Sequence, residues 1–157
     1  MNDQTTVERT SEREVVVTRL INGPPRLVFE AWTKAELFQR WWVPASFRQN
    51  LRSCELDVRV GGGYRLVFEV DGTSMAFFGR YLEVTPGARL VWTNDEGGED
   101  VAAITTVTFE ARGDRTLITL RDLHPSKEAL EASGSTEALP ESFRQLDELI
   151  TGLAPAA

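Results

Sequence analysis

Residues 54–72 read CELDVRVGGGYRLVFEVDG and carry the clearest repeating pattern of the chain. Apolar side chains stand at every second position in both halves of this stretch, and side chains alternate between the two faces of a β-strand with the same period. These positions are Cys54, Leu56, Val58 and Val60, then Tyr64, Leu66, Phe68 and Val70. Three glycines, 61–63, separate the halves, and a gap this short joins antiparallel strands, not parallel ones. The stretch therefore predicts two antiparallel strands.

The same punctuation continues on both sides of this stretch. Turn signals such as Asp71-Gly72 and Pro86-Gly87 separate further apolar runs. Together they predict a meander with strands over 50–60, 63–71, 74–84, 88–94, 101–111 and 115–123. Residues 14–21 are rich in β-branched side chains and predict one earlier strand. Within 74–94 both faces of the strands carry apolar groups, so the pattern does not indicate which side points inward.

Helical spacing appears in two places. After Pro24-Pro25, pairs such as Val28 with Trp32 and Phe38 with Trp42 are four residues apart and predict two short helices. Thr33 and Glu36 fit a capping box at the start of the second helix. Apolar positions recur at helical spacing from Leu139 to Leu153 and predict a long last helix, in which Pro140 fits only the first turn.

These elements predict one α+β domain over residues 13–153. Its curved antiparallel sheet of about seven strands wraps around the long C-terminal helix, two short helices follow the first strand, and a cavity lies between sheet and helix. Residues 1–12 hold one aliphatic side chain besides Met1 and are expected to be disordered. Residues 154–157 are expected to be a loose tail.

Composition excludes several classes of function. Seventeen basic and 24 acidic residues give a net charge of −7, with no basic cluster of the kind that binds nucleic acid. A single cysteine, Cys54, excludes an internal disulfide and a multi-cysteine metal site. No apolar run is long enough to span a membrane, and the N-terminus does not look like a signal peptide. We therefore expect a cytoplasmic protein with no cofactor, no metal, no nucleic-acid partner and no membrane insertion.

Several motifs between residues 15 and 150 resemble the START and polyketide-cyclase-like superfamily, often called SRPBCC. Within it the chain is most similar to the branch named for the C-terminal domain of an activator of the heat-shock chaperone ATPase. The matching motifs are Val17-Thr18-Arg19, Val28-Phe29-Glu30-Ala31-Trp32-Thr33, Arg40-Trp41-Trp42, Gly79, Glu83, Pro86, Arg89-Leu90-Val91-Trp92-Thr93 and Leu146-Asp147-Glu148-Leu149. The resemblance implies the helix-grip fold and a hydrophobic ligand pocket, and it does not imply one particular reaction.

Two departures from the family pattern concern the expected mouth of the cavity. Relatives often have Gly-Pro after the paired tryptophans, where this chain has Val43-Pro44. Many also place Gly-Trp at the start of the last helix, where Glu141-Ser142 stands here. The ligand preference of relatives is therefore not carried over.

Aromatic side chains form the largest set of candidate ligand contacts, because small-molecule pockets combine aromatic walls with a few polar groups. The candidates are Trp32, Trp41, Trp42, Phe47, Phe68, Phe77, Trp92 and Phe143. For each of them singly, core packing is the favoured interpretation. As a group, they are expected to include some that line the cavity.

Two arginines complete the set of candidate site residues. Arg19 shares a strand face with Val17 and Ile21, and Arg121 is placed in the same way beside Leu117. A guanidinium on an apolar face can bind a ligand carboxylate, pair with an internal acid, or reach water at the rim. These alternatives stay open.

No catalytic residue is assigned. The sole histidine, His124, is interpreted as a surface-loop residue, and no carboxylate pair such as Glu69 with Glu83 has a defined geometry. The leading hypothesis is the binding of a small hydrophobic molecule in the cavity, without catalysis. The alternatives are a protein-interaction module related to chaperone ATPase activation and a cyclase- or hydrolase-like enzyme. A homodimer and a chaperone partner stay open, the latter less favoured.

Overall fold

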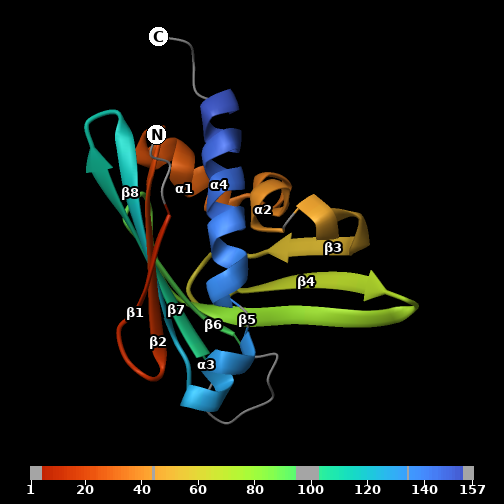
Figure 1. The fold of residues 1–157 in the computed structure, drawn as a ribbon. Helices are drawn as coiled ribbons and strands as arrows, with labels where there is room; N and C mark the ends of the chain where they lie inside the picture. The colour runs from red at the N-terminus through yellow and green to blue at the C-terminus, as the bar shows by residue number, and fades with distance from the viewer. Residues whose placement is uncertain (1–4, 44, 95–102, 134, 154–157) are drawn as a thin grey trace.

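The computed structural model describes residues 5–43, 45–94, 103–133 and 135–153. It contains one curved antiparallel sheet that does not close, with the long helix α4 (Ser135–Leu153) lying along its inner side (Figure 1). The predicted α+β helix-grip architecture is confirmed. The sheet has eight strands, in the order β1-β2-β8-β7-β6-β5-β4-β3, where about seven were predicted.

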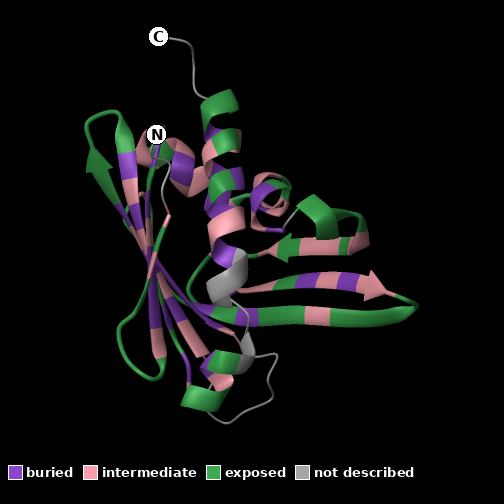
Figure 2. Ribbon diagram, in the orientation of Figure 1, coloured by how far each residue is buried: buried purple, intermediate pink, exposed green. Residues whose placement is uncertain are grey.

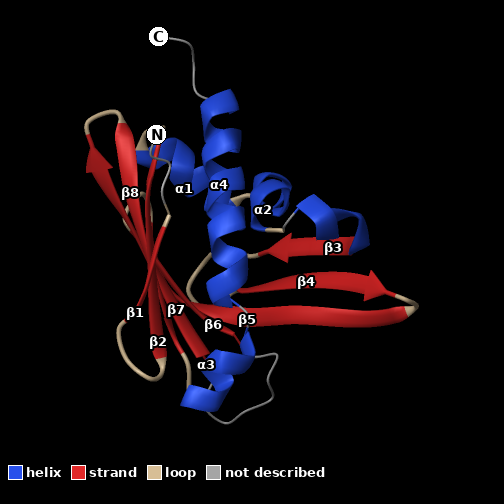
Figure 3. Ribbon diagram, in the orientation of Figure 1, coloured by secondary structure: helices blue, strands red, loops and turns tan. Residues whose placement is uncertain are grey.

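All seven predicted strands are present, but the strand predicted over 50–60 ends at Leu56, which leaves Val58 and Val60 outside it. The seven strands are β2 (Glu14–Ile21), β3 (Leu51–Leu56), β4 (Gly63–Val70), β5 (Thr73–Thr85), β6 (Arg89–Asn94), β7 (Ala103–Arg112) and β8 (Arg115–Leu123). Consecutive strands from β3 to β8 pair as antiparallel neighbours, and β2 pairs with β8 (Figure 3). At the β4–β5 turn, Asp71 and Gly72 have φ values of 53° and 80°, as a tight hairpin turn of this type requires.

The eighth strand, β1 (Thr6–Arg9), corrects the prediction of a disordered tail over residues 1–12. It pairs antiparallel with β2, from Thr6 opposite Thr18 to Arg9 opposite Val15. The physical reason is that the edge of β2 offers unpaired backbone groups, so β1 needs little apolar content of its own. Val7 alone packs against the core. Residues 1–4 and the predicted loose tail 154–157 lie outside the described residues.

The helices also differ in detail from the prediction. Both short helices are present, as α1 (Pro25–Thr33) and α2 (Ala35–Trp42), and a 3-10 helix, η1 (Ala45–Asn50), follows them. The predicted capping box is wrong: Lys34 is the N-cap of α2, and the Thr33 hydroxyl donates instead to the Phe29 carbonyl at 3.0 Å. The last helix begins at Ser135, which places Pro140 inside it, and an extra helix, α3 (Lys127–Ser133), precedes it.

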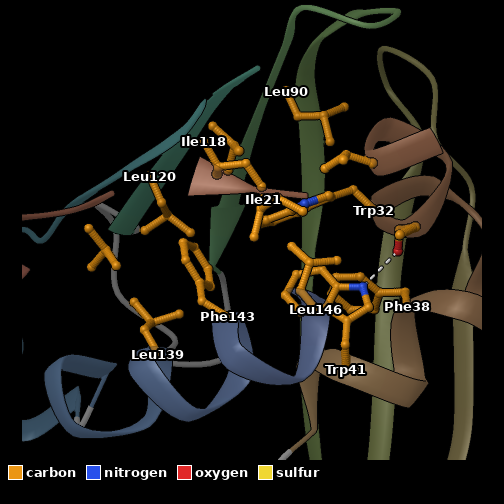
Figure 4. Packing of buried hydrophobic residues seen from close by; sticks show 14 of the residues in the cluster. Ile21, Trp32, Phe38, Trp41, Leu90, Ile118, Leu120, Leu139, Phe143 and Leu146 are labelled. Carbon is orange, nitrogen blue, oxygen red and sulfur yellow. Dashed lines mark hydrogen bonds between the residues drawn. The ribbon is translucent and has the colours of Figure 1, made fainter. Parts of the chain in front are cut away.

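The hydrophobic core fills the space between α1, α2, α4 and the inner face of the sheet (Figure 2). Strand β2 contributes Ile21, β6 contributes Leu90, β8 contributes Ile118 and Leu120, and α4 contributes Leu146 (Figure 4). The β4–β5 hairpin extends beyond α4, and the inner face there is more exposed. The structure thereby assigns the faces of residues 74–94: Phe77, Tyr81, Leu90 and Trp92 point inward.

Candidate functional site

The interior between the helices and the sheet holds a cluster of seven aromatic rings. We call it the Trp32 cluster, and it consists of Trp32, Phe38, Trp41, Trp42, Trp92, Phe109 and Phe143. The other six ring centroids lie between 4.6 Å (Trp41) and 6.3 Å (Phe38) from that of Trp32. Side chains from α2, from the sheet and from α4 therefore all contact Trp32.

Local sequence explains why these rings meet. Trp32 lies on the buried face of α1 together with Val28 and Ala31, and the next helix turns Phe38 and Trp41 toward it. Trp92 comes from the inner face of β6, opposite Thr105 of β7. The i,i+4 spacing in the sequence already paired Phe38 with Trp42, but Phe109 carried no signal of its own.

The two central tryptophans differ in their hydrogen bonding. Trp41 is fully buried, and its Nε1–H donates to the Ala31 carbonyl oxygen at 2.9 Å (Figure 4). Trp32 is 1% exposed, and its buried Nε1 has no hydrogen-bond partner among the described residues. A buried Trp N–H usually finds a partner, and leaving a polar group unpaired costs about 1–3 kcal/mol. The Trp32 cluster thus contains one donor that its neighbours leave free.

A second feature of the inner face is a line of hydrogen-bonded polar side chains, which we call the polar row: Tyr64, Asn94, Thr105, Asp122 and His124. The Tyr64 hydroxyl donates to Asn94 Oδ1 at 2.9 Å, and Asn94 Nδ2 donates to Thr105 Oγ1 at 2.9 Å. Thr105 donates to Asp122 Oδ1 at 3.0 Å, and His124 Nε2 lies 3.1 Å from Asp122 Oδ2. Every member has at least one partner within the row.

A glycine makes the long reach of the polar row feasible. Tyr64 on β4 is opposite Gly79 on β5, yet its hydroxyl contacts Thr93 and Asn94 on β6. A Cβ atom at residue 79 would collide with the Thr93 carbonyl oxygen and crowd the Tyr64 ring. The absence of a side chain therefore lets Tyr64 lie across β5.

The polar row corrects the interpretation of His124 as a surface-loop residue. His124 is buried, its ring contacts the Asp122 carboxylate, and its backbone N–H donates to the Arg13 carbonyl oxygen at 2.8 Å. The sequence did not single out Asp122, because both faces of β8 carry apolar side chains and only the structure shows that Asp122 shares the inner face with Ile118 and Leu120. The contact of Asp122 with Thr105 depends on the register of β7 against β8, which the predicted meander does not specify.

The structure divides the predicted aromatic residues into two groups. Five belong to the Trp32 cluster: Trp32, Trp41, Trp42, Trp92 and Phe143. The other three are Phe47, Phe68 and Phe77, and Phe68 contacts the other two toward the end of the β4–β5 hairpin. Phe68 lies 5.6 Å from Phe47 and 5.6 Å from Phe77 by ring centroids, and Phe47 and Phe77 are exposed. No ring contact joins these two groups of described residues, although Phe68 belongs to the same hydrophobic core as Trp32.

The two predicted arginines lie on opposite faces of the sheet. Arg19 points into the interior, where its Nη2 lies 3.1 Å from Asp147 Oδ2 of α4 and its Nη1 donates to the Thr5 hydroxyl at 2.9 Å. Of the alternatives left open, pairing with an internal acid is the one observed. The side chain of Arg121 is 53% exposed and lies 3.8 Å from Glu14. The expectation that Arg121 shares the inner face is corrected by this placement.

Other candidates for chemistry have unfavourable surroundings. Burial, assisted by the nearby Glu55 carboxylate, raises the pKa of the Cys54 thiol to about 11, so the thiol stays protonated near neutral pH and is a poor nucleophile. Burial also raises the pKa of the Tyr81 hydroxyl. Within the described ranges, no three His, Cys, Asp or Glu side chains converge as metal ligands. No helix in those same ranges has the length and apolarity that crossing a membrane requires.

Comparison with protein families identifies the group to which this architecture belongs. The family model of activator of Hsp90 ATPase homolog 1-like proteins matches residues 22–151. The chain belongs to this family. The match covers α1, α2, strands β3 to β8 and nearly all of α4, so it includes the Trp32 cluster and the polar row. Proteins of this family and the wider SRPBCC group commonly bind hydrophobic ligands.

Several solved protein structures are similar to this chain in fold. A protein of Nitrosomonas europaea is 25% identical, with a TM-score of 0.79 over 90% of this chain and 96% of its own. A protein of Chromobacterium violaceum is 26% identical, with a TM-score of 0.74 over 89% and 98%. A Rhodobacter sphaeroides protein is 18% identical, with a TM-score of 0.82 over 96% and 100%, and supports the fold alone. No curated protein matches the chain.

Proposed function

We propose that this protein binds a small hydrophobic molecule between the inner face of the sheet and α4, beside Trp32. The observation that carries the proposal is the unpaired Nε1–H of Trp32 at the centre of seven aromatic rings. Aromatic walls combined with a few polar groups are typical of small-molecule sites. A core that served packing alone would gain stability from pairing this donor or replacing it with an apolar ring.

Native mass spectrometry of the purified full chain tests the proposal most directly. A co-purified small molecule should appear as added mass that is lost after denaturing extraction, and its composition identifies the ligand class. Tryptophan fluorescence gives a second measurement, because three of the four tryptophans surround Trp32 or are in contact with it. Loading the protein with candidate apolar molecules should therefore change its emission.

The matched control for this experiment is Phe77→Ala. Phe77 is 41% exposed and belongs to the other aromatic group, so its removal should leave the added mass in place. Phe143→Leu alters the Trp32 cluster itself and should reduce the amount bound. Equal retention by both variants, or an apo mass after incubation with a broad set of apolar molecules, would contradict the proposal.

The alternative functions have less support. A chaperone ATPase partner is suggested by the family's description alone, and a pull-down with the chaperone would test it. Acid–base catalysis would need titratable groups directed at a substrate, whereas the Asp122 carboxylate is engaged by Thr105 and His124. A homodimer stays a prediction that sedimentation can test.

A further inference from the structure

We infer that the ligand carries an uncharged oxygen that only accepts hydrogen bonds, such as a ketone, ester or ether oxygen, and that Trp32 Nε1–H donates to it. This inference rests on the proposed function and narrows its ligand class. The indole N–H is a donor only, so its partner has to be an acceptor. Among the described residues none supplies that acceptor.

Trp41 shows that the fold can satisfy an indole in this cluster. Its ring centroid is 4.6 Å from that of Trp32, and its Nε1–H has the Ala31 carbonyl oxygen as a partner. The unpaired state of Trp32 is therefore specific to one side chain and not general to the cluster. In Figure 4 the Trp32 indole extends from α1 into the interior between the sheet and α4, where Ile21, Ile118 and Phe143 also point. We therefore place the accepting group of the ligand beside this donor.

The surroundings of Trp32 disfavour a charged ligand. All seven members of the Trp32 cluster are aromatic, and a carboxylate moved among them would lose its hydration with one neutral donor in return. Arg19, the one arginine buried among the described residues, has its guanidinium engaged by Asp147 and Thr5. These contacts disfavour Arg19 as the partner of a ligand carboxylate.

The same surroundings disfavour an alcohol as the accepting group. A hydroxyl that accepts from Trp32 brings its own O–H, which also needs a partner once it is buried. Trp92 is opposite Thr105 of the polar row, and the row's oxygens on Asn94, Thr105 and Asp122 already accept hydrogen bonds. An acceptor-only oxygen satisfies Trp32 without creating a new unpaired donor.

The test uses two probes of similar shape, α-tetralone and the hydrocarbon tetralin, with the full-length wild-type chain and two variants. Affinities are measured by titration, and the quantity compared is the ratio of the tetralin Kd to the tetralone Kd. Trp32→Phe should lower this ratio about tenfold relative to wild type, equivalent to about 1.4 kcal/mol. Trp41→Phe is the matched control, since its donor is already engaged, and should leave the ratio within about twofold.

A second measurement on the wild-type protein does not depend on the variants folding. In a protein labelled with ¹⁵N at the indole nitrogens, the Trp32 Nε1–H resonance should move downfield when tetralone binds and not when tetralin binds. The outcomes separate the two claims. Binding of both probes with an unchanged ratio in Trp32→Phe, or with equal Trp32 shifts, overturns the acceptor inference alone. Binding of neither probe counts against the proposed function and removes the inference with it.

Discussion

The polar row and the Trp32 cluster are neighbours on the same face of the sheet, yet they differ in how their hydrogen-bonding groups are satisfied. In the polar row, side chains from four strand regions satisfy one another in sequence from Tyr64 to His124. In the Trp32 cluster, the buried Nε1–H of Trp32 has no partner among the described residues. The row is a self-satisfied network that ties neighbouring strands together, and the cluster is the place where we propose that a ligand binds.

The largest expected effect is in the polar row. Asp122→Ala removes the acceptor of both Thr105 and His124 and should lower the free energy of unfolding by about 3 kcal/mol. Urea denaturation followed by circular dichroism measures this loss. The adjacent Arg121 is the control, because its exposed side chain lies on the other face, and Arg121→Ala should change stability by no more than about 0.5 kcal/mol. Similar losses of unfolding free energy in Asp122→Ala and Arg121→Ala would show that the hydrogen bonds of the polar row do not stabilise the fold.

The next effect compares the two central tryptophans directly. Trp41→Phe leaves the buried Ala31 carbonyl oxygen without its side-chain donor, whereas Trp32→Phe removes a donor that had no partner. Both variants lose similar ring volume, so the difference between their unfolding free energies isolates the hydrogen bond. We expect Trp41→Phe to be less stable than Trp32→Phe by about 1–2 kcal/mol. Equal stabilities in the ligand-free protein would mean that Trp32 is satisfied after all.

A smaller effect is expected at the far end of the polar row. Tyr64→Phe removes the hydroxyl that contacts Asn94 and Thr93 while keeping the ring over Gly79. The loss should be about 1 kcal/mol, which corresponds to a decrease in Tm of about 2–4 °C for a domain of this size. Differential scanning calorimetry measures it. An unchanged Tm would indicate that water replaces the hydroxyl without cost.

The smallest effect belongs to the exposed aromatic group. Phe77 is half in solvent and contacts Phe68 only through a ring edge, so Phe77→Ala should cost less than about 1 kcal/mol. Its effect on the affinity for tetralone should stay within about twofold. The same titration measures this affinity. A large loss would show that Phe77 and the Trp32 cluster belong to one ligand site.

Much of the fold could be predicted because short stretches of sequence determine its strands and turns. The alternation from Tyr64 to Val70 and the turn at Asp71-Gly72 require no knowledge of distant contacts, whereas the alternation through Val60 continued past the end of β3 at Leu56. Strand β1 could not be predicted, because it is held by backbone pairing with β2 and not by a pattern of its own side chains. The start of α4 was placed at Leu139 and not at Ser135 because Pro140 was expected in a first turn.

The site could be predicted only in part, for reasons that individual residues illustrate. Trp32 and its neighbours stood out by residue type and helical spacing, but the missing partner of Nε1 is a property of three-dimensional packing. Arg121 was misplaced because both faces of β8 carry leucine and isoleucine side chains, so alternation alone did not tell inside from outside. Asp122 and His124 are two residues apart, and only the strand pairing connects them to Thr105, Asn94 and Tyr64.

Strand β1 also bears on self-association of the chain. It covers the outer edge of β2, where three consecutive valines, 15–17, would otherwise present an unpaired backbone. An open edge rich in β-branched residues is a template for pairing with another chain, and proteins commonly cover such edges with a short or charged strand. Thr6–Arg9 is both short and charged, so its removal would turn a protected edge into a starting point for aggregation.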